Sequence, residues 1–329
     1  MRILMVNEFE VYGGAETHLK ALSEGLRQKG HKVELLAKFK DWQREPSAKW
    51  KALTEIRNSF KPEVLHFHNV FALTEPLAFA VGTGFPHLLS LHDYWPFCPM
   101  RNLILNKFSC PQPCQENCSL VQRRGGLLKE LVRAASLRIT FNPTSASILE
   151  AHGLHCEVIP HGVDIEEFKP APLKTSQVVF LMAKEGIWEK GERYFDAILQ
   201  EGGGKGLKII GQPQKKVKET LAQSLIFINT GVYQETFCLT VAEAMAAGCA
   251  VISFDTAGPH HLLAPDTGFL VPIADVQGAV LTLHNLLSNP QRAVKIGFKA
   301  RRHIVEHFNL GQEITSYEAI YQRVAGDGR

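Results

Sequence analysis

Short apolar strands alternate with amphipathic helices along this chain, and the alternation runs through twice. The first series contains predicted strands at 2–7, 31–37, 63–69 and 87–93, a strand, turn and helix over 136–153, and a strand over 156–164. Its first helix, 15–30, places Leu19, Leu22 and Leu26 on one face. Strands that alternate with helices predict a parallel sheet joined by right-handed crossovers.

The second series follows a polar, proline-containing stretch at 170–177, which we interpret as a linker. It contains predicted strands at 178–183, 206–211, 225–230, 249–254 and 268–273, a helix near 190–200 and a helical end from about 275 to 325. A length of 329 residues also favours two domains. We therefore expect an α/β protein with two Rossmann-like, doubly wound domains that face each other across a cleft, with ligands bound outside the strand ends.

Composition restricts the class of protein further. Hydrophobic residues make up 45% and charged residues 21%, as in ordinary soluble proteins, and the net charge of +3 does not indicate a nucleic-acid partner. No apolar run reaches the length of a membrane span, and residues 1–9 are typical of a first strand, not of a signal peptide. Seven cysteines, an odd number, predict a reducing, cytoplasmic location with free thiols.

Two glutamates, Glu235 and Glu243, stand near the start of a predicted helix over about 237–247 that ends at Gly248. With Glu235 or Thr236 at the helix N-terminus, the two carboxylates would point about 80° apart. The free amides and positive dipole of a helix start suit a phosphate group. The pair is thus predicted to hold two parts of an elongated ligand, although acidic residues also simply stabilise helix starts.

The glycine pattern argues against a hydride-transfer enzyme and against a nucleoside triphosphatase. The first strand is followed by Gly13 and Gly14 without a G-x-G-x-x-G sequence, and "EGGGKG" at 201–206 lacks the phosphate-loop pattern.

Five stretches of the chain occur in an order that resembles the retaining, GT-B-fold glycosyltransferases of family 4. They are "YGGAETHLKALSEGLRQKGHKV" (12–33), "HDYW" (92–95), "VIPHGVD" (158–164), "EKG" (189–191) and "ETFCLTVAEAMAAGCAV" (235–251).

The resemblance covers nearly the whole chain and implies a reaction. Such an enzyme moves a hexosyl group from a UDP-, GDP- or ADP-linked sugar to a glycan, a lipid-linked or a small-molecule acceptor, often in cell-envelope glycan biosynthesis, and needs no cofactor or metal for catalysis. It implies an acceptor-binding domain at 1–165 and a nucleotide-sugar-binding domain at 166–305. The final helix, 306–329, can cross back to the first domain.

The resemblance also assigns roles to residues. Lys184 and Lys190 would meet the charge of the leaving diphosphate, although the first is usually arginine. Glu235 would hold the donor sugar and Glu243 the ribose, while the amides of Phe237, Cys238 and Leu239 would contact phosphate or sugar. Gly13 and Gly14 would lie beside the diphosphate in a loop that needs close approach to a ligand or a positive φ. The catalytic set would be His92, Glu235 and Lys190.

Several of these residues have plainer interpretations. Lys184 and Lys190 can be solvated, His92 can be structural, and Gly13–Gly14 can form a tight turn. The sequence also departs from the family, with Cys238 where glycine is frequent, His161 where asparagine is common, and His260–His261 where a glutamate is usual. The segment 211–225 is shorter than usual. Two alternatives to a transferase therefore stay open, namely a nucleotide-sugar epimerase of the same architecture and a catalytically silent GT-B-like binding protein.

Two further features have no fixed role. Cys98, Cys110, Cys114 and Cys118 are close enough in sequence to bind a structural zinc ion or iron–sulfur cluster, and the alternatives are packed free thiols or disulfides. Residues 122–138 combine basic and apolar side chains. They predict either peripheral contact with the inner face of a membrane or a helix with one packed and one solvated face.

Overall fold

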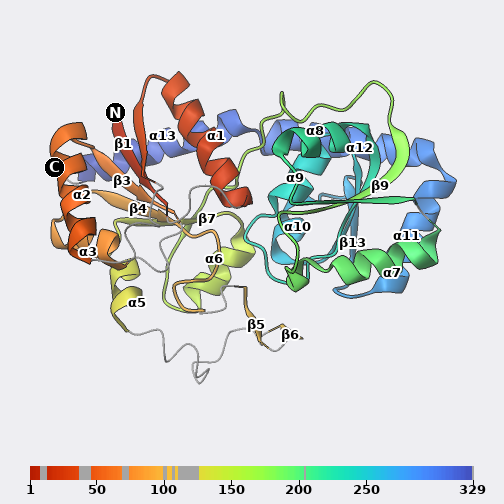
Figure 1. Ribbon diagram of the computed structural model, residues 1–329, viewed down its shortest axis with the longest axis horizontal. Helices are drawn as coiled ribbons and strands as arrows, with labels where there is room; N and C mark the ends of the chain where they lie inside the picture. Colours follow the sequence, from red (N-terminus) through yellow and green to blue (C-terminus); the bar gives the residue numbers. More distant parts are fainter. Residues whose placement is uncertain are drawn as a thin grey trace. The chain divides into compact units, whose positions relative to one another are not determined.

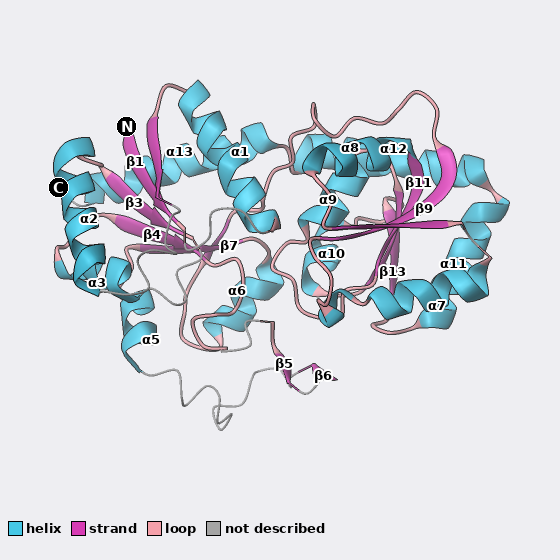
Figure 2. Cartoon of the chain, viewed as in Figure 1, coloured by secondary structure: helices cyan, strands magenta, loops and turns pink. Residues whose placement is uncertain are grey.

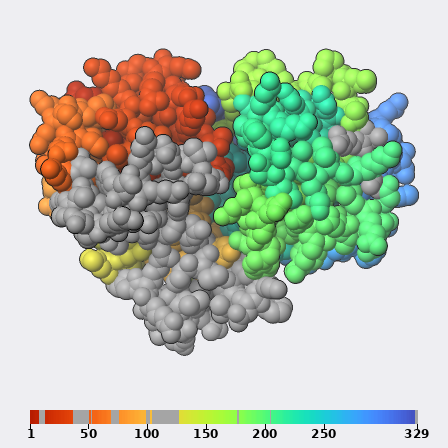
Figure 3. All heavy atoms as spheres, in the orientation of Figure 1, coloured from red at the N-terminus to blue at the C-terminus, as the bar shows by residue number. Residues whose placement is uncertain are grey.

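A computed structural model of the chain describes residues 1–7, 13–36, 46–68, 74–98, 102–105, 108–109, 126–203 and 205–327 (Figure 2, Figure 3). The chain forms two compact units. Unit 1 consists of Met1–Ile159 together with Glu313–Arg329, and unit 2 of Pro160–Gln312. The division falls a few residues before the expected position 165, and the C-terminal segment from Glu313 on belongs to the first unit.

Unit 1 is built on a six-stranded parallel sheet with the order β2-β1-β3-β4-β7-β8. The strands are β1 (Arg2–Val6), β2 (Lys32–Leu36), β3 (Val64–Phe67), β4 (His87–Ser90), β7 (Leu137–Thr140) and β8 (Glu157–Val158). A short antiparallel pair, β5 (Ile104–Leu105) and β6 (Phe108–Ser109), forms a separate sheet. Because the strand order reverses beside β1, the ends of β1, β3 and β4 lie at the edge where such sheets bind ligands.

Helices cover both faces of this sheet (Figure 1). They are α1 (Gly14–Gln28), α2 (Pro46–Phe60), α3 (Thr74–Gly82), α5 (Gly126–Arg133), α6 (Pro143–Glu150) and α13 (Leu310–Asp327). Leu4, Leu65 and Leu89 point to one face and join a hydrophobic core with side chains of α2, α3 and α5. Strand side chains alternate between the faces, so His66 and Ser90 point the other way, where they meet α13.

Unit 2 is a five-stranded parallel sheet with the order β10-β9-β11-β12-β13. Its strands are β9 (Thr175–Met182), β10 (Gly206–Ile210), β11 (Ser224–Asn229), β12 (Ala250–Phe254) and β13 (Gly268–Val271). The central strands β11 and β12 are buried along their whole length, as their continuous apolar sequences predict.

The helices of unit 2 also lie on both sides of the sheet. They are the short 3₁₀ helix η2 (Trp188–Lys190) and α7 (Glu192–Gly202), α8 (Gln214–Gln223), α9 (Leu239–Ala246), α10 (Ala257–Leu262), α11 (Val276–Ser288) and α12 (Pro290–His307). Figure 1 shows α8, α9 and α12 on one face and α7 with α11 on the other. The C-terminal edge of the sheet therefore carries the loops before η2, α8, α9 and α10.

Several boundaries predicted from the sequence are wrong. Residues 175–177 of the expected linker belong to β9, and the strand expected over 156–164 is reduced to the two residues of β8. The helix expected within 122–138 ends at Arg133, because Arg138 lies in β7 and closes the helix end. Its guanidinium donates to the carbonyls of Val132, Arg133 and Ala135 at 3.1, 2.8 and 3.2 Å.

Candidate active site

The loop before α9 does not have the conformation that the sequence predicted. Helix α9 begins at Leu239, and the residue before it, Cys238, has φ 75° and ψ 68°. A residue in this left-handed region cannot extend the helix toward Glu235, so the expected start at 237 is wrong and the angle of about 80° between the carboxylates does not apply. Cysteine at this position carries backbone strain that glycine would avoid.

Helix α10 holds this loop in place. The backbone amide of Ala257 donates to the side-chain oxygen of Gln234 at 2.9 Å. Gly258 lies so close that a Cβ there would stand 2.4 Å from the carbonyl oxygen of Phe237. His260 and His261, which depart from the family, thus lie in a short helix that supports the loop, and His260 pairs with Asp255 at 2.8 Å.

Lys190 and Glu235 form a largely buried ion pair, with 3.0 Å between Nζ and Oε2. Gly191 ends the turn that carries Lys190, at φ 76°, where a Cβ would stand 1.9 Å from the carbonyl oxygen of Thr230. The Thr230 hydroxyl donates to the carbonyls of Lys190 and Gly191 at 3.2 and 2.9 Å. Tight backbone packing therefore places Lys190 beside the end of β11 and against Glu235.

The electrostatics of the pair follow from burial and charge. Burial lowers the pKa of Lys190, but the Glu235 carboxylate outweighs it, and the pKa lies well above its usual range. The ammonium also lies 5.0 Å from the centre of the Tyr233 ring. Burial, together with Glu235, raises the pKa of the Cys238 thiol to about 12. Lys190 is therefore a cation throughout the physiological range, and Cys238 is a neutral thiol.

Glu243 lies on α9 and bonds to a neighbouring helix. Its Oε1 accepts a hydrogen bond from Nε2 of Gln214, the first residue of α8, at 3.2 Å. Burial raises the pKa of Glu243 to about 7, although Gln214 and Lys218 oppose the shift. The carboxyl group is thus poised between its two protonation states near neutral pH.

Three of the other predicted donor-side residues have distinct positions. Lys184 follows β9, is exposed and forms no ion pair with any residue that the structure describes. The Phe237 side chain is buried and packs against His161, with ring centres 5.2 Å apart, so its backbone is the part that can face a ligand. Leu239 is the first helical residue of α9 and offers its amide at the helix start.

In unit 1, Gly13 and Gly14 start helix α1. Gly13 is the residue before the helix, with φ −172° and ψ −169°, and neither glycine has a positive φ. The expectation that a left-handed backbone explains these glycines is therefore wrong. Among the residues that the structure describes, a Cβ at Gly13 would meet the flexible carboxylate of Glu16, at 3.3 Å. Close approach to a ligand stays a prediction for both residues.

His92 lies two residues after β4, at the ligand-binding edge of the unit 1 sheet. Its Nε2 is 3.0 Å from Nδ1 of His68, and its ring centre is 4.8 Å from that of Phe141. Burial, together with His18, lowers the pKa of His92 to about 3. His92 is therefore a neutral imidazole at physiological pH.

Side chains that the sequence analysis did not single out lie beside Glu235 and Glu243 in unit 2 and beside His92 in unit 1. Gln214 lies in the shortened segment 211–225, four residues after the end of β10, and Tyr233 and Gln234 directly precede Glu235. His68 directly follows β3. A position in the segment that follows a strand was the available signal for all four residues, but it does not show which side chain turns inward.

The cysteine and membrane predictions fall partly outside the described residues. Cys98 is buried in unit 1, whereas Cys110, Cys114 and Cys118 lie outside the described residues, so metal binding stays a prediction. Residues 122–125 also lie outside them, and Leu128, Leu131 and Val132 of α5 are in the core. Among the described helices, none combines the length and the apolar composition that crossing a membrane requires.

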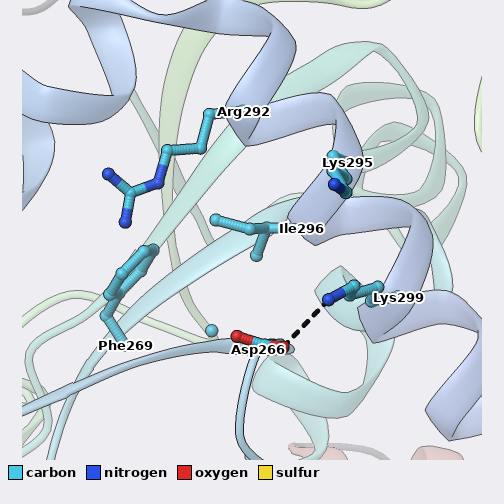
Figure 4. A pocket seen from close by; sticks show the side chains of 7 residues that line it. Asp266, Phe269, Arg292, Lys295, Ile296 and Lys299 are labelled. Carbon is cyan, nitrogen blue, oxygen red and sulfur yellow. Dashed lines mark hydrogen bonds and ion pairs between the residues drawn. The ribbon is translucent and has the colours of Figure 1, made fainter.

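A separate hollow of about 270 Å³ in unit 2 is lined by Asp266, Gly268, Phe269, Arg292, Lys295, Ile296 and Lys299 (Figure 4). Lys299 pairs with Asp266 at 2.9 Å, and Arg292 lies over the ring of Phe269 at 5.8 Å. The hollow lies at the beginning of β13. Glu235 and Lys190 follow the opposite ends of the strands, so the hollow is not part of their group.

Two family models match consecutive parts of the chain. Glycosyltransferase Family 4 matches residues 12–167, and Glycosyl transferases group 1 matches residues 166–303. The chain belongs to glycosyltransferase family 4. The phosphatidyl-myo-inositol mannosyltransferase of Mycolicibacterium smegmatis is 24% identical, over 100% of this chain and 95% of that protein. A human relative, one of the subunits of phosphatidylinositol N-acetylglucosaminyltransferase, is 23% identical, over 79% of this chain and 63% of its own length.

Solved structures of glycosyltransferases share the fold. Sucrose-phosphate synthase from Thermosynechococcus elongatus superposes with a TM-score of 0.77 at 14% identity, over 99% of this chain and 100% of that one. Anabaena HepE in complex with UDP gives 0.75 at 17% identity, over 98% and 100%. The predicted GT-B class of two parallel-sheet α/β domains is thereby confirmed, and glycosyltransferase activity follows from the family.

Proposed function

We propose that this family 4 member is a retaining hexosyltransferase that uses a nucleoside-diphosphate sugar as donor. The observation that carries the proposal is the Lys190–Glu235 pair beside the start of α9. A diphosphate leaving group gains negative charge in the transition state, and a buried cation next to free helix amides is suited to receive it. Glu235 then accepts hydrogen bonds from donor-sugar hydroxyls. Lys184 remains a candidate second cation.

The second carboxylate has a different environment. Glu243 is held by Gln214, and its raised pKa reflects burial without a cationic partner at ion-pair distance in the described part of unit 2. Two ribose hydroxyls would supply hydrogen bonds that stabilise the ionised form. We therefore assign Glu243 to the nucleoside and Glu235 to the sugar. In unit 1, neutral His92 would donate a hydrogen bond to the sugar or to the phosphate.

We propose a glycan or lipid-linked acceptor. Two relatives over most of this chain are named for phosphatidyl-myo-inositol and phosphatidylinositol acceptors, which favours the lipid-linked class. Membrane contact through 122–138 would involve Leu127, which is 68% exposed, because the apolar side chains beside it on α5 are buried. Flotation with anionic vesicles, for wild type and Leu127→Ser, tests this contact apart from catalysis.

The donor is tested by thermal unfolding with UDP, GDP, ADP and NAD. A ligand that binds the native state stabilises it by about 2.7 kcal/mol at a hundredfold excess over Kd. We expect one nucleoside diphosphate to raise the Tm of the wild type and of the control Glu219→Gln, whose side chain is exposed on α8, but not of Glu243→Gln. No shift with any of them would favour the silent binding protein.

The reaction is tested by NMR of the sugar product. An α-linked donor should give an α-linked product if the configuration is retained. A β-linked product would refute retention while leaving transfer intact. An epimerised donor formed without acceptor would instead favour the epimerase, for which we see no specific support in the site.

A further inference from the structure

His68 stands between a network of buried polar side chains and His92. The network lies on the sheet face of unit 1 that α13 covers. Three residues spaced four apart on α13, Glu313, Tyr317 and Tyr321, each contact a different element. Glu313 pairs with His18 of α1 at 3.0 Å, Tyr317 bonds to Ser90 of β4 at 3.0 Å, and Tyr321 bonds to His66 of β3 at 2.8 Å.

His66 is fixed on both sides of its ring. Its Nδ1 lies 2.8 Å from the Tyr321 hydroxyl and its Nε2 lies 2.8 Å from the Ser90 hydroxyl. Burial raises the pKa of Tyr321 well above its usual range, so this phenol stays protonated. Hydroxyl groups can donate or accept a hydrogen bond. The hydrogen bonds from Tyr321 through His66 to Ser90 can therefore all form with the three side chains neutral.

His68 lies beside this fixed ring and reaches the candidate catalytic histidine. The ring centres of His66 and His68 are 3.9 Å apart, and Nδ1 of His68 lies 3.0 Å from Nε2 of His92. The backbone amide of His68 donates to the carbonyl of Val6 in β1 at 2.9 Å, which fixes its main chain as well. His68 thus has a set position from which it contacts one particular nitrogen of His92.

Two neutral imidazoles can share one hydrogen bond in only two ways. Either Nδ1–H of His68 donates to Nε2 of His92, or Nε2–H of His92 donates to Nδ1 of His68. The second arrangement requires a proton on Nε2 of His68. That atom is buried and has no hydrogen-bond partner among the residues that the structure describes. A buried N–H without an acceptor is costly and rare, whereas an unfilled lone pair is better tolerated.

We propose that His68 is a positioning residue that donates from Nδ1 to His92 and so fixes the proton of His92 on Nδ1. This inference rests on the proposed function, in which His92 contacts the donor sugar or phosphate. His92 then acts as a hydrogen-bond donor from Nδ1, and its Nε2 is occupied by His68. The residue that sets this arrangement comes from the end of β3 and is held through His66 by the C-terminal helix.

The first test measures the tautomer directly. Nitrogen-15 NMR distinguishes the two ring nitrogens of a neutral histidine, because the bare nitrogen resonates far downfield of the protonated one. The signals of His92 are assigned by their loss in His92→Gln. We expect Nδ1 of His92 to be protonated in the wild type. A proton on Nε2 of His92 would overturn the proposal, whatever the enzyme's activity.

The second test compares two substitutions that differ by one atom. His68→Asn keeps a possible N–H donor near the position of Nδ1, whereas ionised His68→Asp can only accept. We expect the asparagine variant to keep the His92 tautomer and a kcat close to wild type. We expect the aspartate variant to move the proton to Nε2 or to charge His92, and to lower kcat about 10²-fold at unchanged donor KM.

The control is His87→Asn, because His87 is a buried strand histidine on the opposite sheet face that bonds to the Phe85 carbonyl at 2.7 Å. It should leave the His92 tautomer and kcat unchanged. Equal kcat in the asparagine and aspartate variants of His68, with both folded by Tm, would refute the positioning role. A chain that transfers no sugar but shows the expected tautomer would refute the proposed function and leave the hydrogen bond from His68 to His92 standing.

Discussion

Replacing Lys190 by methionine removes a cation while keeping most of the side-chain length. Its Nζ lies 3.0 Å from Oε2 of Glu235, and the two side chains are 20% and 9% exposed. Two unit charges at this separation attract by about 5 kcal/mol at an effective dielectric constant of about 20, before desolvation is subtracted. Loss of one partner of a buried pair costs about 3–5 kcal/mol, and the partial exposure of Lys190 favours the lower end. We expect Lys190→Met to be about 3 kcal/mol less stable.

The double variant Lys190→Met/Glu235→Gln separates stability from ligand binding. It removes both charges, so no uncompensated carboxylate remains, and most of the stability should return. Affinity for the nucleoside diphosphate should not return, because the phosphate still lacks its cation. A charged hydrogen bond contributes about 1.5–3 kcal/mol, which corresponds to a loss of about 10- to 100-fold in Kd.

Urea unfolding and calorimetric titration with the nucleoside diphosphate that stabilises the wild type measure the two quantities. Glu235→Gln alone serves as the control, because its carboxylate is assigned to the sugar and the diphosphate carries none. The reasoning would be refuted if the double variant bound the diphosphate as tightly as the wild type. The effect of Lys190 would then be one of loop structure, transmitted through the buried charge that it leaves behind.

Three further predictions rest on single contacts. Gly191→Ala should lower the free energy of unfolding in urea by clearly more than Gly203→Ala. Both glycines have a left-handed φ, of 76° and 70°, but of the two only Gly191 would press a Cβ against a carbonyl oxygen, at 1.9 Å. Equal losses of stability would contradict the close approach at Gly191. Arg301→Met should cost about 1–3 kcal/mol in urea unfolding because its guanidinium binds three backbone carbonyls, whereas exposed Arg302→Met should cost little. Burial raises the pKa of Glu243 from 4.5 to about 7, so the native state holds this proton more tightly than the unfolded state and stability should fall as pH rises between these values. The urea midpoint of Glu243→Gln should fall less than that of the wild type across this window, and identical slopes would contradict the raised pKa.

The strands and helices could largely be predicted from the sequence because their signals are local. The apolar runs at 225–230 and 249–254 are central strands, and the helical end from about 275 contains α11, α12 and α13. Errors occurred where the hydrogen bonds of one side chain decide a boundary. Arg138 closes α5 from β7, only five residues beyond the end of the helix, and the apolar pattern does not show this. Likewise, the sequence did not predict the left-handed backbone at Cys238, because this conformation is usually recognised from a glycine and the residue here is cysteine.

For the candidate site, the sequence predicted which residues matter better than it predicted which side chains they contact. Glu235 and Glu243 stand out by their spacing, and Lys190 and His92 through the family resemblance, but neither signal shows what each side chain touches. The pairing of Lys190 with Glu235 depends on the close approach at Gly191, and the raised pKa of Glu243 depends on burial beside α8. These contacts arise only when strand ends far apart in sequence meet at one edge of a sheet.

The surroundings of Lys190 and of His92 accommodate buried polar groups in different ways. Unit 2 keeps a charge, and it does so where Lys190 has a carboxylate within 3.0 Å and a free helix start beside it. Next to His92, unit 1 buries histidines whose pKa values are lowered by desolvation and which are therefore neutral. A neutral group can be held deep in a core without a counter-ion, provided that its hydrogen bonds are arranged in advance. The division fits the proposed function, in which Lys190 would face the charge that builds up on the diphosphate and His92 would donate a hydrogen bond without adding or removing charge.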